Sequence, residues 1–318
     1  MNAVDRFDAA NPICSIIIPA YNVAEVLSRS VESALAQSLQ NIEVIIVDDA
    51  SQDSTAETAL SLARQDNRIR LLRSQTNRGP GAARSLGLRK ARGHWIAVLD
   101  ADDWYAETRL AKLISTAEEQ SVDMIADNLV LVDPATNEVV GRSLPMKSND
   151  QYRVTVTRML QHTVPAGRIN LGWCKPVFSA DFLREHAIEW REFRHAEDFL
   201  MDMEVLLAGG TFILVGEASY YYTQRFGTRS GSVSQHSRTA RSVDEQQAVI
   251  DDLLKRYSAA IDDCLLSGLL RMRSQIEVAG YLLDVRDAVI AKRFGHALMP
   301  IGKALLNPVI LFGCLLAR

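Results

Sequence analysis

The chain has 318 residues, of which 47% are hydrophobic, and a formal net charge of −4. That length suffices for one large domain with an appendage or for two ordinary domains. The acidic balance argues against a nucleic-acid-binding protein, which carries a basic excess. Its four cysteines lie far apart without a CxxC pair, which argues against zinc and against a disulfide framework. We find no secretory-signal pattern and no apolar run of about 18 residues, and therefore expect a cytoplasmic protein.

The first hundred residues alternate between short apolar runs and amphipathic segments. The apolar runs predict strands at 13–18, 42–47, 69–73 and 94–99. The segments between them predict helices at 23–38, 54–64 and 81–91, the second with a capping-box pattern at Ser54 and Glu57. Because this rhythm is typical of parallel βαβ units, we expect a doubly wound, nucleotide-type sheet in the first ~110 residues.

Beyond Asp103 the alternation loosens. Helices are expected at 106–119, 153–162, 179–186 and 197–208, with strands at 122–126, 211–215 and 218–223 and with strand and loop at 128–150. Residues 225–240 form a polar, basic stretch, and the pattern from 241 onward is helical and amphipathic. We therefore expect a catalytic domain over 12–225, followed over 226–318 by a flexible loop and a helical C-terminal extension.

Acidic residues follow two of the predicted strands at the point where each strand ends. The stretch "DDASQD" (48–53) follows one strand, "DADD" (100–103) follows another, and Tyr21 comes after the first strand. Ligands of open α/β sheets bind outside the carboxyl ends of the strands. Each Asp can be a simple turn former or helix cap, but three such segments together favour a site. A carboxylate cluster repels phosphates unless a hard cation such as Mg²⁺ or Mn²⁺ bridges them, so we expect a metal that holds a diphosphate.

At these positions the sequence resembles the family 2 glycosyltransferases, which have the GT-A fold. The matching segments, in the order of the family, are "SIIIPAYN" (15–22), "VIIVDDASQDST" (44–55), "NRGPGAARSLGL" (77–88), "GHWIAVLDADD" (93–103), "GWCKPVF" (172–178) and "EDFLM" (197–201). The resemblance covers about residues 12–230. It implies an α/β fold with a mixed, mainly parallel sheet flanked by helices, and an inverting transfer of a sugar from a nucleotide-sugar donor, typically a UDP-sugar.

The resemblance also implies roles for individual residues. Asp49 corresponds to the residue that contacts uracil, and Pro19 and Tyr21 belong to the loop that flanks the base. Arg84 lies near the donor, Asp100 and Asp102 match the Asp-x-Asp motif with Asp102 as the metal ligand, and Asp198 matches the general base. From the residues alone, Glu197 and Asp198 are equal candidates for the base, because adjacent helical side chains point about 100° apart; the resemblance decides for Asp198.

Several other signals leave alternatives open. Trp173 and Lys175 fit either the acceptor side of a site or, respectively, core packing and a charged side chain that reaches to the surface. "GPGAAR" (79–84) nearly matches a dinucleotide-binding fingerprint, but Arg84 stands where the third glycine belongs, so the glycines are expected to allow a tight turn into the helix. Arg229, in the basic loop, is a candidate to close over the diphosphate.

The last segment, residues 296–318, is apolar with sparse Lys and Arg and two prolines. It fits a segment that lies on the inner face of a membrane, which would suit a glycan or polyprenyl-diphosphate-linked oligosaccharide as acceptor in cell-surface polysaccharide synthesis. The alternative is a helix that packs on protein. Two other functions remain: a non-catalytic sugar-nucleotide or glycan-binding module on the same fold, and a nucleotidyltransferase, although the latter class carries a Gly-rich basic loop where this chain has "PAYNVAE" (19–25).

Overall fold

One continuous sheet organises the chain. The computed structural model describes residues 8, 10–163, 170–223 and 240–290. The strands run in the order β3-β2-β1-β4-β9-β6-β10-β5, with β7 paired to β6 and β8 to β10. Their bounds are β1 Cys14–Ala20, β2 Ile42–Asp48, β3 Ile69–Arg73, β4 Trp95–Val98, β5 Trp104–Tyr105, β6 Met124–Val132, β7 Val139–Arg142, β8 Gln151–Val154, β9 Val177–Ser179 and β10 Phe212–Thr223.

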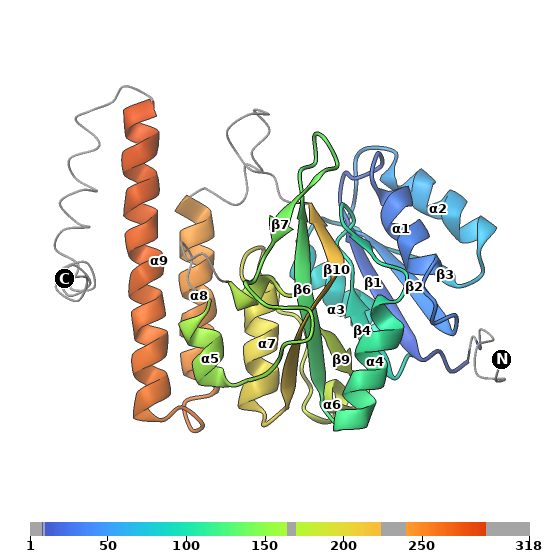
Figure 1. Cartoon of the computed structure of the whole chain (residues 1–318). Helices are drawn as coiled ribbons and strands as arrows, with labels where there is room; N and C mark the ends of the chain where they lie inside the picture. The colour runs from blue at the N-terminus through green and yellow to red at the C-terminus, as the bar shows by residue number, and fades with distance from the viewer. Residues whose placement is uncertain (1–7, 9, 164–169, 224–239, 291–318) are drawn as a thin grey trace.

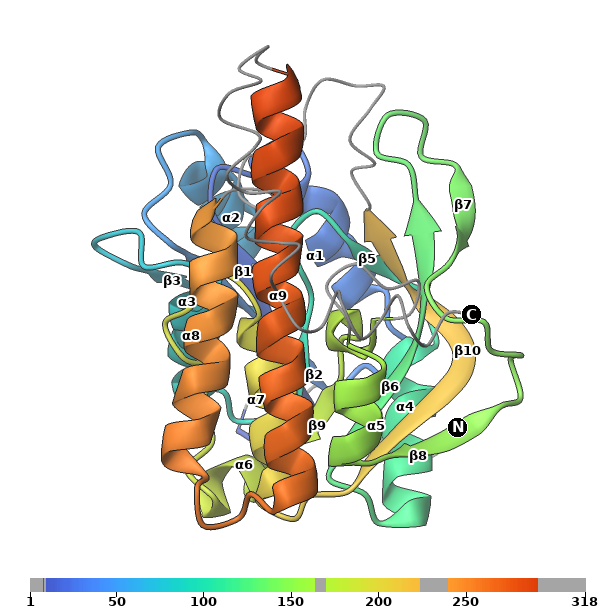
Figure 2. The same ribbon diagram turned by 90° about the vertical axis from the view of Figure 1, so that its left-hand side faces the viewer.

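Helices cover both faces of this sheet (Figure 1). They are α1 Leu27–Leu35, α2 Thr55–Gln65, α3 Pro80–Lys90, α4 Arg109–Gln120, α5 Val156–Gln161, α6 Ala180–Glu185, α7 Glu197–Leu207, α8 Ala240–Arg256 and α9 Asp263–Ile290, with a short 3₁₀ helix η1 at Leu171–Trp173. Figure 2 shows α8 and α9 side by side in front of α7. The expected mixed, mainly parallel sheet flanked by helices is confirmed, and so is a helical C-terminal segment.

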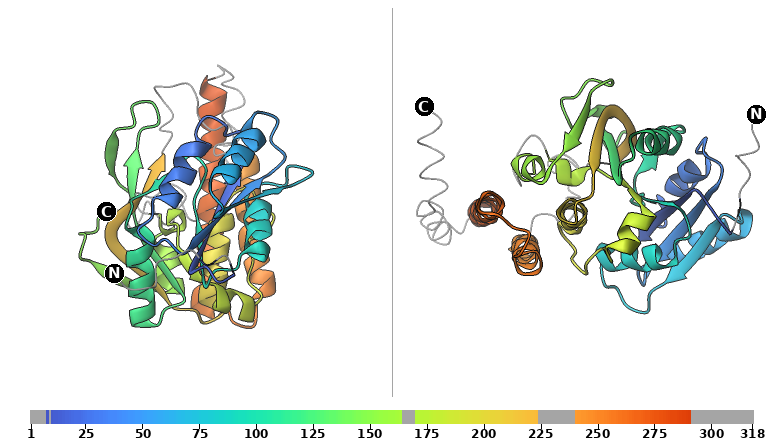
Figure 3. Two further views of the ribbon diagram at one scale, coloured as in Figure 1. Left: turned by 90° about the vertical axis from the view of Figure 1, so that its right-hand side faces the viewer. Right: turned by 90° about the horizontal axis from the view of Figure 1, so that it is seen from below.

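Alternate side chains of the central strands enter two separate cores. Ile16 and Ile18 pack with residues of α1 and α4 on one face, whereas Ile17 packs with residues of α3 and α7 on the other. Strands covered on both faces read as continuous apolar runs, which is why the pattern of "SIII" predicted β1. Figure 3, viewed from below, shows α7, α8 and α9 stacked in succession on the second face.

The element bounds differ from the predicted ones where side chains bind the backbone. The first helix begins at Leu27, not at residue 23, because the Val23 N–H donates to Thr55 and the Ala24 N–H to Asp53. The capping box at Ser54 does not form; instead Asp53 accepts from the Thr55 N–H and hydroxyl at 3.0 and 2.5 Å.

The strands of the second half of the chain differ from the predicted ones in length and number. The strand predicted at 122–126 extends over β6, nine residues in all. Those predicted at 211–215 and 218–223 are one strand, β10, with register shifts between Val215 and Tyr220. The three-residue β9, antiparallel to β4 and β6, was not predicted, since three residues are too few to display a period. Among the described residues, no helix has both the length and the apolar character that a bilayer crossing requires.

A buried ion pair joins α4 to the neighbouring strands β6 and β10 and to the segment before β9. Arg109 of α4 and Asp127 of β6 are 0% exposed, and their charged groups lie 2.8 Å apart. Arg109 also donates to the backbone carbonyl of Lys175 at 2.6 Å, and Asp127 accepts from the N–H and hydroxyl of Ser219. Breaking a buried pair on one side leaves an uncompensated charge in the core.

We therefore expect Asp127→Asn to lower the free energy of unfolding by about 3–5 kcal/mol. The matched control is Glu217→Gln, which removes a surface pair with Lys112 and should cost at most about 1 kcal/mol. Urea unfolding of both variants measures the difference. Equal costs for the two substitutions would contradict a structural role for the buried pair.

Candidate active site

The ends of β1 and β2 form one corner of the site. Ala20 pairs with Asp48 in the parallel ladder, and the Asp49 N–H donates to the Ala20 carbonyl at 2.9 Å. Tyr21 and Asp49 follow directly, so they stand next to each other at the carboxyl edge of the sheet. Tyr21 is 40% exposed, whereas Asp49 is buried. Pro19, still within β1, is half-buried and precedes this corner.

Asp49 is held by the start of α3. Its carboxylate accepts hydrogen bonds from the backbone N–H of Arg78 at 3.0 Å and of Gly79 at 2.7 Å. Gly79 has φ +92°, a conformation that favours glycine, and a Cβ on Gly81 would lie 2.0 Å from the Arg191 carbonyl oxygen. The glycines of "GPGAAR" therefore provide the expected tight turn into the helix, and they also admit the loop around Arg191.

The other carboxylates of "DDASQD" have structural partners. Asp48 forms an ion pair with Arg73 at 2.9 Å and accepts from the Ser51 N–H. Asp53 caps the turn at Thr55, as described above. The turn-forming alternative thus describes these two residues.

Asp103, in "DADD", is a buried anchor. It is 1% exposed and accepts hydrogen bonds from the Tyr220 hydroxyl at 2.8 Å and the Thr223 N–H at 2.7 Å. Burial raises the pKa of Asp103 well above its usual range, and the neighbouring charges of Asp102 and Asp100 raise it further. The Asp103 carboxyl thus ties the end of β10 to the turn after β4.

The backbone of Asp102, in the same turn, is held by hydrogen bonds from neighbouring elements. Its backbone carbonyl accepts from the Arg29 guanidinium and the Thr223 hydroxyl, both at 2.7 Å. The guanidinium of Arg29 lies over the Trp104 ring, 4.0 Å from its centroid. Contacts from α1, β5 and β10 therefore fix the turn that carries Asp102. Asp102 itself is half-buried at the edge of the sheet.

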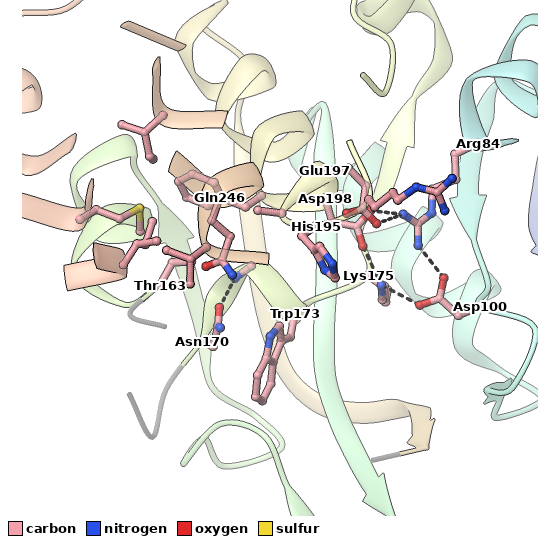
Figure 4. Close-up of a pocket in the computed structure, with 18 of the residues that line it drawn as sticks. Arg84, Asp100, Thr163, Asn170, Trp173, Lys175, His195, Glu197, Asp198 and Gln246 are labelled. Atoms are coloured by element: carbon pink, nitrogen blue, oxygen red, sulfur yellow. Dashed lines mark hydrogen bonds and ion pairs between the residues drawn. The ribbon is translucent and has the colours of Figure 1, made fainter. Parts of the chain in front are cut away.

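Five charged residues meet beside this turn, and we call them the charged cluster: Arg84, Asp100, Lys175, Glu197 and Asp198 (Figure 4). The Lys175 ammonium lies 2.8 Å from Asp100 and 2.7 Å from Asp198. The Arg84 guanidinium lies 2.7 Å from Asp100, 2.5 Å from Glu197 and 3.0 Å from Asp198. Two cations thus connect the acidic turn after β4 to the first turn of α7.

The two adjacent acids of α7 differ in their electrostatics. Burial alone would raise the pKa of Asp198, but Arg84 and Lys175 outweigh it and hold that pKa below its usual range. Burial is the largest influence on Glu197 and raises its pKa to about 7. The positive charge of Arg84 lowers this pKa, and the negative charge of Asp198 raises it. Asp198 is therefore an ionised carboxylate at neutral pH, whereas Glu197 is partly protonated.

For three residues in or beside the charged cluster, the structure decides what the sequence left open or did not indicate. Lys175 is 7% exposed and paired, so it is not a side chain that reaches to the surface. Trp190 donates its indole N–H to Asp198 at 3.2 Å, and it lies in no recognised motif that could have indicated this contact. Trp173 is 40% exposed, which excludes core packing as its role.

A cavity of about 440 Å³ opens beside the charged cluster. Arg84, Asp100 and Asp198 line it, together with residues of η1, α8 and α9. Pro19, Tyr21, Asp49 and Asp102 are not among its lining residues. Pro19, Tyr21 and Asp49 belong to the corner at the ends of β1 and β2, and Asp102 belongs to the turn after β4. α3, which begins beside Asp49, carries Arg84 to the cavity. Arg229 and residues 296–318 lie outside the described residues.

The donor set for a metal ion is sparse. Within the part of the chain that the structure describes, no group of three or more His, Cys, Asp or Glu side chains could hold a metal ion. Asp100 is committed to Arg84 and Lys175. One carboxylate at Asp102, completed by phosphate oxygens, is nevertheless a set that Mg²⁺ and Mn²⁺ use. The residues present fit an ion that binds together with a nucleotide, not one that the protein holds alone.

The fold and the acidic strand ends define the class as a GT-A glycosyltransferase. The sequence model of glycosyl transferase family 2 matches residues 15–174. The succinoglycan biosynthesis protein ExoO of Rhizobium meliloti is 36% identical over 292 residues, which span 87% of this chain and 77% of that protein. The chain therefore belongs to glycosyltransferase family 2, among members of the exopolysaccharide type.

Further comparisons agree with this assignment. An Escherichia coli protein named UDP-Glc:alpha-D-GlcNAc-diphosphoundecaprenol beta-1,3-glucosyltransferase WfaP is 38% identical over 110 residues, 35% of this chain and 43% of that protein. TarS 1–349 of S. aureus superposes with a TM-score of 0.61 at 18% identity, covering 89% of this chain and 88% of that one. A mannosyltransferase of Pyrobaculum calidifontis, solved with GDP-Man and Mn²⁺, superposes with 0.59 at 16% identity, covering 99% and 83%. The structural matches define the fold.

The raised pKa of Glu197 predicts a pH-dependent stability. In wild type, a folded-state pKa of about 7 against an unfolded value near 4.5 means that the contribution of Glu197 to stability falls as pH rises through this interval. Glu197→Gln lacks this titration but can still contact Arg84. The unfolding free energy of the variant minus that of wild type should therefore increase between pH 4.5 and 7 and level off above. Urea unfolding across pH 4–8 measures it, and a difference independent of pH would refute the assignment.

Proposed function

We propose that the protein is an inverting glycosyltransferase that moves a sugar from a nucleotide-sugar donor, a UDP-sugar, to a hydroxyl of a glycan or lipid-linked oligosaccharide in cell-surface polysaccharide synthesis. One observation carries the proposal. Arg84 and Lys175 bridge Asp100 of the Asp-x-Asp motif to Asp198 of the Glu-Asp pair at the edge of one cavity. A donor diphosphate and an attacking hydroxyl need such neighbouring subsites.

The corner formed by β1 and β2 is the proposed nucleoside subsite. Tyr21 offers an exposed ring against which a base can stack, and Pro19 shapes the loop beside it. Asp49, fixed by the Arg78 and Gly79 N–H groups, can accept a hydrogen bond from a ring N–H of the base. Arg84 lies further along α3 and Asp100 lies in the turn after β4. Both are proposed to face the ribose, sugar and diphosphate. Arg229 is proposed to close over the diphosphate.

Asp102 is the proposed ligand of Mg²⁺ or Mn²⁺. When bound, such an ion would neutralise negative charge that develops on the departing diphosphate. The chain contributes the geometry of the turn: Arg29 and Thr223 hold the Asp102 backbone, and Asp103, bonded to the Thr223 N–H, anchors its far side. Asp100, paired with both cations, is then available to orient the sugar or ribose and not the ion.

Asp198 is the proposed general base. The acceptor oxygen forms a bond to the anomeric carbon while the bond from that carbon to the nucleoside diphosphate breaks, and the hydroxyl proton moves to the Asp198 carboxylate. Lys175 and Arg84 keep this carboxylate ionised. Because both cations also attract phosphate, we infer that the bound diphosphate competes for them and weakens their hold on Asp198. Glu197 is directed to Arg84 and serves to orient it.

We infer a lipid-linked acceptor from the name of a similar protein and from the composition of residues 296–318. The name of the E. coli relative specifies a diphosphoundecaprenol-linked sugar. A lipid-linked acceptor would bring the protein to the inner face of the cell membrane, where residues 296–318, which carry Lys and Arg among apolar residues, are proposed to bind. No nucleic acid is involved in this proposal.

Substitution of the base tests the reaction. Asp198→Asn should lower kcat by a factor of about 10² to 10⁴, because the isosteric amide cannot take the proton. Its affinity for UDP-sugar, measured by calorimetry, should stay close to that of wild type. If Glu197→Gln loses transfer and Asp198→Asn does not, the two roles are reversed. A wild-type protein that binds donor but releases no UDP in the presence of any acceptor would instead favour the non-catalytic binding module.

The sparse donor set predicts mutual dependence of metal and nucleotide. In thermal melts, Mn²⁺ with UDP should raise Tm by several degrees, whereas either ligand alone should shift it little. Asp102→Asn should reduce the joint shift, and EDTA should abolish donor turnover. An equal Tm shift by UDP with EDTA and with Mn²⁺ would exclude the metal role of Asp102.

A further inference from the structure

Trp173 presents an aromatic ring to the cavity that holds the proposed base. It ends η1 and is 40% exposed, although large aromatic side chains are usually buried for most of their area. Trp173 lines the same cavity as Asp198 and Lys175, and it precedes Lys175 by two residues. The backbone that carries this ring is therefore the backbone that positions the cation bound to Asp198.

The Trp173 ring stacks against a second aromatic ring. Its plane lies within 11° of the Tyr222 ring, with the ring centroids 6.4 Å apart. Tyr222, on β10, also lines the cavity. Tyr222 lies against one side of the indole, and the exposed area of Trp173 is therefore on the rest of its surface. An ordered aromatic face loses little conformational entropy when a ligand covers it.

Uncharged polar groups accompany the ring. Figure 4 shows Thr163, Asn170 and Gln246 on one side of Trp173 and the charged cluster on the other. All three line the cavity, and Gln246 comes from α8. The Thr163 hydroxyl is buried, with the residue 9% exposed, and has no hydrogen-bond partner among the residues that the structure describes. A buried polar group without a partner is costly unless a ligand or water supplies one.

These features match the chemistry of a pyranose ring. A sugar has one face of C–H groups, which can cover an aromatic ring, and a rim of hydroxyls, which donate to and accept from amides and hydroxyls. In an inverting displacement, the acceptor and the departing diphosphate lie on opposite sides of the anomeric carbon. Trp173 lies on the side of Asp198 away from Arg84 (Figure 4), which is the acceptor side if Arg84 faces the diphosphate.

We propose that Trp173, stacked on Tyr222 and flanked by Thr163, Asn170 and Gln246, is the platform that binds a sugar ring of the acceptor. The proposal rests on the function proposed above and adds the acceptor subsite to it. It makes α8, through Gln246, a part of substrate recognition. Trp173 acts by positioning the ring that carries the attacking hydroxyl, or the next ring, and takes no part in proton transfer.

Saturation-transfer NMR tests the platform without requiring turnover. The probes are cellotetraose, laminaritetraose and chitotetraose. At least one should receive saturation from wild type, on the C–H protons of one ring face, and the signal should be lost in Trp173→Ala and largely kept in Trp173→Phe. The matched control is Tyr152→Ala, which removes a 43%-exposed aromatic on β8 outside the cavity lining and should behave as wild type. Circular dichroism and Tm verify that each variant is folded.

Kinetics then distinguish the acceptor from the donor. Trp173→Ala should raise the KM of the acceptor about tenfold, and much more than that of the nucleotide sugar. Saturation that persists in Trp173→Ala, saturation absent from wild type with all three probes, or a rise confined to the donor KM would each overturn the platform. A wild type that binds these glycans through Trp173 yet consumes no nucleotide sugar would leave the platform standing and refute the proposed transferase.

Discussion

Two buried cations shared among three carboxylates are the constraint on which the site depends. A buried carboxylate without a counter-charge is strongly unfavourable, and so is a buried ammonium or guanidinium. Asp100 and Asp198 can therefore stand close together only because Lys175 and Arg84 lie between them. Arg109 in turn holds the Lys175 backbone and is itself neutralised by Asp127. A connected set of charges thus extends from the core of the sheet to the cavity.

The site is assembled from residues across the described chain and not only from the segment that defines the family. The family match ends at residue 174, one position before Lys175 and well before Asp198. α3 connects the corner at Asp49 to the cavity, since the N–H groups of Arg78 and Gly79 directly before it hold Asp49 and its second turn carries Arg84. α8 and α9 contribute the far wall of the cavity. The C-terminal helices are therefore part of the cavity, and in the proposed acceptor subsite variation in them would change the acceptor without altering the donor side.

Sequence patterns were sufficient where structure is local and periodic. The strands β1, β2, β3 and β4 and the helices between them follow from apolar runs and from amphipathic spacing, because parallel strands are buried on both faces. The acidic residues after β2 and β4 follow from the topology, since parallel strands end at a common edge. Predictions were wrong where partners are distant: the start of α1 depends on Asp53 and Thr55, and β9 on pairing with β4 and β6.

By itself, the sequence determined the fold class, the family and the edge of the sheet at which chemistry can occur. It did not determine which carboxylates are charged. Asp100 and Asp103 are both acids of "DADD", yet their pKa values move in opposite directions. Despite burial, Lys175 and Arg84 lower the pKa of Asp100, whereas burial raises the pKa of Asp103, which meets Tyr220 in the core. Arg84 and Glu197 are 113 positions apart. Only folding brings such groups into a medium of low polarity, where the neighbours of an acid, and not its identity, decide its protonation.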